Sequence, residues 1–126
     1  MKKIINTKKA PAPIGPYNQA VFIKDTLYIS GQIPIDPATG VLVDGDIKAE
    51  TKQSMENLKA ILEEAGLTFE HVIKSSIFIK DMNQFAQINE VYGTYFDANT
   101  APARETVEVA NLPKFVNVEI SMIAVK

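Results

Sequence analysis

The sequence predicts a two-layer α+β domain, with one mixed β-sheet and two helices packed on one of its faces. Two long segments repeat apolar residues at spacings of three and four, the pattern of a helix that buries one face. Five shorter segments alternate apolar and polar residues or are rich in β-branched residues, as half-buried strands are. In chain order the elements read ββ, α, β, α, ββ, and two amphipathic helices bury their apolar faces best by packing on the sheet.

Five strands are expected, over residues 19–24, 26–30, 72–80, 103–109 and 116–125. A turn near Asp25 joins the first two. The segment Asp36-Pro-Ala-Thr-Gly40 is typical of a further turn, because proline fixes φ and glycine supplies a positive φ. The last strand has the clearest pattern, with an apolar residue at every second position from Val116 to Ala124.

The first helix is expected to begin after Asp46, which can cap it, and to end at Ala65 before Gly66. The segment Asp81-Met-Asn-Gln84 has the spacing of a capping box and opens a second helix that extends to Phe96. With both helices on one face, the other face of the sheet has no cover within the chain. It would expose an apolar patch, so we expect the protein to self-associate.

Composition excludes several function classes. The chain of 126 residues is expected to form a single domain over residues 1–126, and its 46% hydrophobic and 22% charged content excludes disorder as the main state. A net charge of −2 without a basic cluster argues against nucleic-acid binding. The absence of cysteine and the single histidine leave no thiolate nucleophile, no disulfide and no histidine-based metal site. The sequence has no signal peptide or membrane-spanning run, so we expect a cytoplasmic protein with no membrane partner.

The chain contains a single arginine, Arg104, which precedes Glu119 by fifteen positions. If Val116 faces the core, alternation places Glu119 on the opposite face of the last strand, and it places Arg104 and Thr106 on one face of the strand before. Ionised groups are buried only when they are paired or coordinated, so a guanidinium and a carboxylate on rigid strands could form the polar floor of a small anion-binding pocket. The alternative is an exposed sheet face that carries charges.

Three further features have both a functional and a structural interpretation. Gly15-Pro-Tyr17 fits a rigid turn that presents the ring of Tyr17 to a ligand, or a turn whose tyrosine packs against the first strand. Ser30 and Gly31 lie at the end of a strand. Their hydroxyl and backbone N–H can meet a ligand, or the two residues can simply lead from the strand into a turn. Asn89 lies within the second helix and is either a site residue or a solvated one.

Several motifs occur in order along the chain: Ala12-Pro-Ile-Gly-Pro-Tyr17, Ser30-Gly-Gln-Ile-Pro34, Ile77-Phe-Ile-Lys-Asp-Met82, Pro102-Ala-Arg104 and Val107-Glu-Val-Ala-x-Leu-Pro113. Together they resemble the Rid family, specifically its RidA-type reactive imine and enamine deaminases. The resemblance spans essentially the whole chain and is far more specific than any one motif.

The resemblance implies a chorismate-mutase-like α+β fold and a homotrimer with three sites at subunit interfaces. It also implies the activity of a 2-iminobutanoate/2-iminopropanoate deaminase, which hydrolyses 2-imino acids to 2-oxo acids and ammonia. These imines arise from enamines released by pyridoxal-phosphate dehydratases, and the family removes them before they damage other enzymes. The reaction needs one oriented water and one acid–base group, and it requires no metal and no organic cofactor.

The family's carboxylate-binding arginine corresponds to Arg104, and its water-positioning glutamate corresponds to Glu119. The positions that match the lining of the family's pocket are Tyr17, Ser30, Gly31 and Asn89. Members often have Ser-Cys after the arginine, where this chain has Glu105-Thr106. Thr106 still counts as a substrate-binding residue if the family uses the main chain there rather than the sulfur.

Two other interpretations remain. The protein could be a binding module in which Arg104 holds a 2-oxo acid or amino acid without turnover. Ribonuclease activity is sometimes assigned to the family, but the acidic charge balance of this chain does not favour RNA binding. The sequence leaves open which imine is preferred and whether this chain is catalytic.

Overall fold

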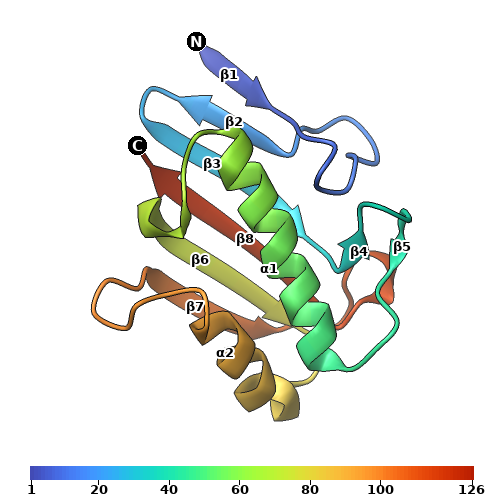
Figure 1. The fold of residues 1–126 in the computed structure, drawn as a ribbon. Helices are drawn as coiled ribbons and strands as arrows, with labels where there is room; N and C mark the ends of the chain where they lie inside the picture. The colour runs from blue at the N-terminus through green and yellow to red at the C-terminus, as the bar shows by residue number, and fades with distance from the viewer.

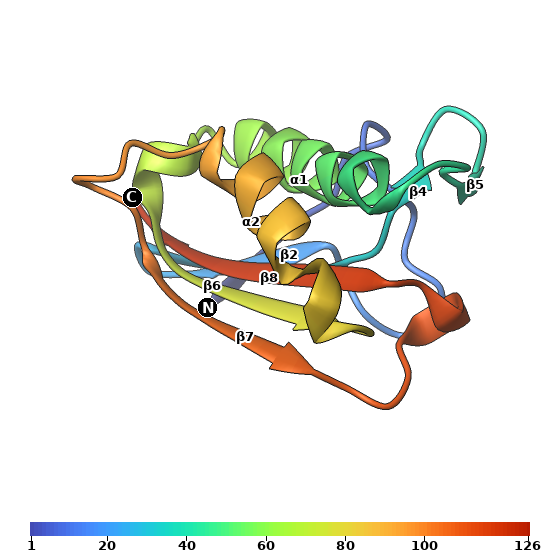
Figure 2. The same cartoon turned by 90° about the horizontal axis from the view of Figure 1, so that it is seen from below.

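One six-stranded sheet carries both helices on a single face, as the computed structural model of residues 1–126 shows (Figures 1 and 2). In spatial order the strands are β1 (Lys2–Ile5), β2 (Ala20–Ile23), β3 (Thr26–Gln32), β8 (Val118–Val125), β6 (Val72–Ile79) and β7 (Ala103–Glu108). Only β6 and β7 pair in parallel, so the sheet is mixed. The predicted two-layer α+β fold is confirmed.

The first helix, α1 (Ile47–Glu64), begins and ends as its sequence predicts. The side chain of Asp46 accepts a hydrogen bond from the backbone N–H of Ala49 at 2.9 Å and caps the helix. Beyond the other end, Gly66 has a φ of +78°, which favours glycine and reverses the chain after the helix.

The second helix, α2 (Phe85–Gly93), is shorter than predicted at both ends. Asp81 caps a 3₁₀ turn over Met82–Gln84 that precedes the helix. After Gly93, the segment up to Phe96 continues in tighter turns with hydrogen bonds between residues three apart. Ring packing accounts for the departure at this end, because the ring centroid of Phe96 lies 5.4 Å from that of Phe69.

Three strands were not predicted from the sequence. Strand β1 at the sheet edge pairs with β2, with Ile4 opposite Val21, yet its two lysines hide the alternation that marks a half-buried strand. Strands β4 (Ile35–Asp36) and β5 (Val41–Leu42) form a short hairpin around the predicted Asp36–Gly40 turn. Two-residue strands are too short to produce a periodic pattern.

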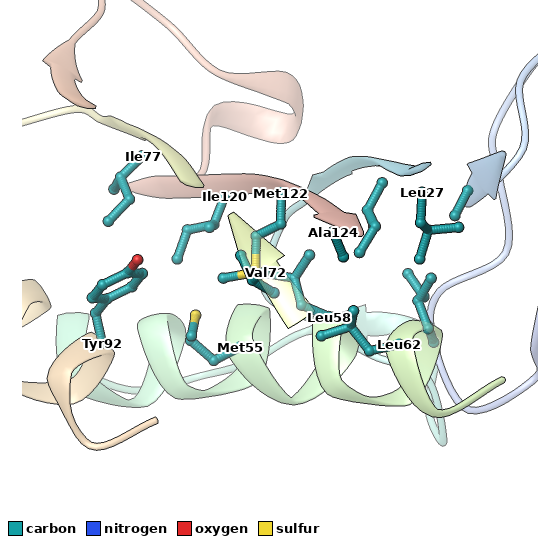
Figure 3. Close-up of a cluster of buried hydrophobic side chains, with 14 of the residues drawn as sticks. Leu27, Met55, Leu58, Leu62, Val72, Ile77, Tyr92, Ile120, Met122 and Ala124 are labelled. Atoms are coloured by element: carbon teal, nitrogen blue, oxygen red, sulfur yellow. The ribbon is translucent and has the colours of Figure 1, made fainter. Parts of the chain in front are cut away.

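The core lies between α1 and the middle of the sheet. Met55, Leu58 and Leu62 point from α1 toward Ile120 and Met122 of β8 (Figure 3). Side chains of β8 alternate between this core and the opposite face of the sheet, as predicted. Neither helix of the structure has the length and apolar character needed to cross a membrane.

The face of the sheet opposite the helices has no cover within the chain, as Figure 2 shows. It carries Tyr28, which is 50% exposed and pairs with Ile123, and Phe78, which pairs with Val107. Self-association through this face stays a prediction.

Leu58 and Leu42 provide a matched test of the core. Leu58 is 0% exposed and Leu42 is 38% exposed. Leu58→Ala should lower the free energy of unfolding by about 2–5 kcal/mol, because it removes buried methyl groups and leaves a cavity. Leu42→Ala should lower it by less than about 1 kcal/mol. Denaturant titration at fixed protein concentration measures both, and equal losses would contradict this description of the core.

Candidate active site

The pairing of strands places the two charged site residues on opposite faces of the sheet. Arg104 on β7 lies opposite Ser75 on β6, and Glu119 on β8 lies opposite Phe78 on the same strand. Ser75 and Phe78 are three positions apart, so their side chains point to opposite faces. Arg104 therefore projects on the helix side and Glu119 on the uncovered side. The predicted polar floor does not form within one chain.

Glu119 lines a cavity of about 440 Å³ together with three of the other predicted site residues, Tyr17, Ser30 and Gly31. The remaining lining residues are Ile14, Ile33, Pro113 and Lys114. We call this cavity the glutamate half-site. Its walls are apolar apart from the carboxylate, the ammonium group and two hydroxyls.

The Gly15-Pro-Tyr17 turn presents the tyrosine ring at this cavity. Gly15 has a φ of +114°, and its carbonyl accepts a hydrogen bond from the backbone N–H of Tyr17 at 2.9 Å. The Tyr17 hydroxyl accepts a bond from the backbone N–H of Ile14 at 3.3 Å, and the residue is 48% exposed. Ser30 Oγ donates to the carbonyl of Asn18 at 2.7 Å, which links the turn to β3.

Because Gly31 has no side chain, there is room beside it for the side chain of Glu119. The pairing of β3 with β8 shifts between Ile29 and Gln32, so Gly31 lies within an irregularity of the strand. A Cβ atom at Gly31 would lie 2.7 Å from Glu119 Cδ, closer than side-chain atoms approach one another. Burial raises the pKa of Glu119 above its ordinary value, because the charged carboxylate is partly removed from water.

Arg104 lies under α2, between the sheet edge and the helix. Its Nη1 donates a hydrogen bond to Asn89 Oδ1 at 2.6 Å. Its Cζ lies over the ring of Tyr92, 5.0 Å from the ring centroid, and 5.6 Å from the centroid of Phe85. The Tyr92 hydroxyl donates to Ser75 Oγ at 2.9 Å.

A second cavity, of about 410 Å³, opens beside Arg104 and is lined by Met82, Phe85, Arg104 and Thr106. We call it the arginine half-site. Thr106 Oγ1 is buried and has no hydrogen-bond partner in the chain. The structure thus groups Arg104 with Asn89 and Thr106, and it groups Glu119 with the other predicted residues.

Sequence reasoning missed three contributors to these half-sites, Phe85, Tyr92 and Lys114. Phe85 and Tyr92 belong to the apolar stripe of the second helix, and their spacing with Asn89 places all three residues on one helix face. No pattern in the sequence indicated Lys114 as a site residue. It lines the glutamate half-site with a φ of +56°, in the region that favours glycine.

No group of three or more histidine, cysteine, aspartate or glutamate residues lies close enough to hold a metal ion.

The raised pKa of Glu119 predicts a specific dependence of stability on pH. The folded chain binds the proton of Glu119 more strongly than the unfolded chain does. This proton therefore stabilises the fold fully below the ordinary pKa of glutamate, and its contribution to the free energy of unfolding is lost as pH rises through the raised pKa of the folded chain. Glu119→Gln should therefore be more stable than the parent at neutral pH, with an advantage that shrinks below about pH 4. Thermal unfolding from pH 3 to pH 8 measures this, and a variant less stable than the parent at pH 7 would contradict it.

Known proteins resemble this chain along its full length. The family model described as Endoribonuclease L-PSP matches residues 7–126. A RutC family protein of Pyrococcus horikoshii is 56% identical over 126 residues, covering 100% of this chain and 99% of its own. The 2-iminobutanoate/2-iminopropanoate deaminase of Mus musculus is 48% identical over 126 residues, covering 100% of this chain and 93% of its own.

Solved structures agree with the fold. The Rid protein family member YyfA of Yersinia pestis, whose function is unknown, superimposes with a TM-score of 0.97 at 48% identity and covers 100% of both chains. Escherichia coli TdcF with bound serine superimposes with a TM-score of 0.92 at 48% identity and covers 98% of both chains. Shared fold, motifs and identity over the whole length lead to one conclusion: this chain belongs to the Rid family and is of the RidA type.

Proposed function

We propose that this protein hydrolyses short 2-imino acids, and the enamines in equilibrium with them, to 2-oxo acids and ammonia. One observation carries the proposal: the chain holds an oriented guanidinium and a partly desolvated carboxylate, each in an open cavity. The activity in the name of the mouse relative supports the same chemistry. The substrates that we propose are 2-iminopropanoate and 2-iminobutanoate.

Arg104 suits the recognition of the substrate's carboxylate. Its planar guanidinium offers two parallel N–H donors to the two carboxylate oxygens, which fixes the ligand's orientation as well as its position. The hydrogen bond to Asn89 uses one donor of Nη1, and four of the five N–H donors of an arginine remain. Thr106 lines the cavity beside Arg104 and is a further residue that we propose for the ligand.

Glu119 suits the proton transfers that the reaction requires. Its raised pKa keeps a larger protonated fraction than an exposed glutamate has, so the carboxyl group can protonate the imine nitrogen and make the carbon electrophilic. The resulting carboxylate then accepts a proton from the attacking water as the C–O bond forms. Transfer of that proton to nitrogen allows the C–N bond to break and ammonia to leave. Glu119 then takes the proton of the remaining hydroxyl as the C=O bond of the 2-oxo acid forms, which restores the protonated carboxyl group.

A complete site requires both half-sites, which lie on different faces of one chain. We propose that a homotrimer brings the arginine half-site of one copy to the glutamate half-site of the next. The uncovered sheet face, with Tyr28 and Phe78, supplies apolar area for that contact. Enclosure between copies would exclude bulk water and strengthen the interactions of both charges with the substrate.

The physiological role that we propose is the removal of reactive enamines and imines released by pyridoxal-phosphate dehydratases in the cytoplasm. No cofactor enters the reaction scheme, because imine hydrolysis needs only water and proton transfer.

A second candidate function is binding without turnover. The structure of Escherichia coli TdcF with bound serine favours it, because serine carries the same carboxylate next to a nitrogen-bearing carbon. We do not propose the RNA cleavage in the description of the family model, since the net charge of −2 and the apolar half-sites suit a small organic acid better than a polyphosphate chain.

Two substitutions distinguish catalysis from binding. Arg104→Ala should abolish both turnover and 2-oxobutanoate binding, because the ligand loses its anchor. Glu119→Gln keeps the shape but removes the acid–base group, so it should lower kcat by about 10²–10⁴-fold and leave 2-oxobutanoate binding within severalfold. Ammonia release from freshly generated imine and calorimetry provide the two measurements.

The parent protein is the control for both readouts. If it binds 2-oxobutanoate but never accelerates imine hydrolysis, the protein is a binding module. If Glu119→Gln hydrolyses imine as fast as the parent, Glu119 is not the acid–base group.

The shared site predicts complementation between inactive variants. Light scattering should give about 42 kDa for three chains of 13.9 kDa each. Arg104→Ala and Glu119→Ala should each be inactive alone, whereas trimers refolded from an equal mixture should regain about a quarter of the parent activity, because that fraction of interfaces pairs two intact half-sites. A monomeric mass, or a mixture no more active than its components, would contradict the shared site.

A further inference from the structure

Arg104 is the only arginine of the chain, and it is held by one face of α2. Phe85, Asn89 and Tyr92 follow one another at spacings of four and three, so their side chains leave the helix on the same side. Each of the three contacts the guanidinium, two through aromatic rings and one through a hydrogen bond of 2.6 Å. We call these three residues the helix clamp.

The helix clamp is anchored to the strand beside Arg104. Tyr92 is only 5% exposed, and its hydroxyl donates to Ser75 Oγ at 2.9 Å. Ser75 is the residue that lies opposite Arg104 in the pairing of β6 with β7. The ring under the guanidinium is therefore fixed to the same place in the sheet from which Arg104 projects.

The chemistry of Asn89 suits a contact with arginine. Its Oδ1 accepts a proton from Arg104, whereas an ionised carboxylate ligand has no proton to donate to that oxygen. A neutral amide also orients the guanidinium without neutralising its charge. An aspartate at this position would pair with the guanidinium and compete with the ligand's carboxylate.

We propose that Phe85, Asn89 and Tyr92 are positioning residues that hold the Arg104 guanidinium in one direction for the substrate's carboxylate, and that Asn89 acts through Arg104 rather than on the substrate. The inference rests on the function proposed above for Arg104. A free arginine side chain samples many rotamers, and fixing it before the ligand arrives raises affinity because less conformational freedom is lost on binding. The rings restrain the guanidinium without using its N–H donors.

The uniqueness of Arg104 allows a direct test that needs no substrate. In protein labelled with ¹⁵N-arginine, the side-chain Nε–Hε group gives one signal, so its heteronuclear NOE reports the mobility of this guanidinium alone. An ordered value is expected for the parent and for Tyr92→Phe, because the ring, which is only 5% exposed, stays packed without the hydroxyl. A mobile value is expected for Asn89→Ala and for Tyr92→Leu. A mobile guanidinium in the parent, or an unchanged one in Asn89→Ala, would overturn the proposal.

A double-mutant cycle tests whether Asn89 acts through Arg104. Asn89→Ala should weaken 2-oxobutanoate binding by about tenfold in the parent but by less than about twofold in an Arg104→Lys background, which keeps the charge and lacks the planar fork. Equal losses in both backgrounds would show a direct contact between Asn89 and the ligand and would overturn this part of the proposal.

Asn89→Asp provides a second comparison on the same helix. It should weaken binding more than Asn89→Ala does, because the new carboxylate competes for the guanidinium. Gln87→Glu is the matched control, since it adds the same charge at an exposed position of α2 that forms no hydrogen bond with Arg104. Binding should stay within about twofold of the parent. Equal effects of the two acidic variants would overturn the proposal.

These outcomes are separable from failure of the proposed function. A parent that fails to bind 2-oxobutanoate contradicts the role of Arg104 in ligand recognition. A parent that binds it and shows a mobile guanidinium contradicts only the helix clamp.

Discussion

The alternation of side chains across one sheet is the constraint on which the rest of the structure depends. Both helices pack on the same face, so every strand has one side committed to the core and one side free of it. On β8, the side chains of Val118 and Ile120 point into the core, and the side chain of Glu119 between them points away from it. A carboxylate can therefore occupy a central strand without crossing the hydrophobic core.

The same constraint keeps the two charged residues of the candidate site apart. Arg104 is on the helix side of the edge strand and Glu119 is on the uncovered side of the central one. Neither charge neutralises the other within a chain, and neither forms a salt bridge. Each therefore remains available to a ligand. In the proposed trimer the two charges meet across a subunit contact, where a substrate that carries both a carboxylate and an imine can lie between them.

The two half-sites keep their geometry by different means. The glutamate half-site relies on an absence of side-chain atoms, since Gly31 leaves room for the Glu119 carboxylate within an irregular part of β3. The arginine half-site relies on added contacts, because the long Arg104 side chain needs the rings and amide of α2 to limit its rotamers. The Glu119 side chain is shorter than that of Arg104 and lies on a central strand, so it requires less support than the longer arginine side chain at the sheet edge.

The sequence by itself determined the layer architecture, both ends of α1 and the alternation of β8, because these features depend on local periodicity and capping chemistry. Its motifs also identified the residues of the candidate site. The tertiary structure alone decided how those residues group. Strand pairing placed Arg104 and Glu119 on opposite faces, and helix packing assigned Phe85 and Tyr92 to the guanidinium. Such contacts join residues far apart in the chain, and local periodicity cannot specify which faces meet.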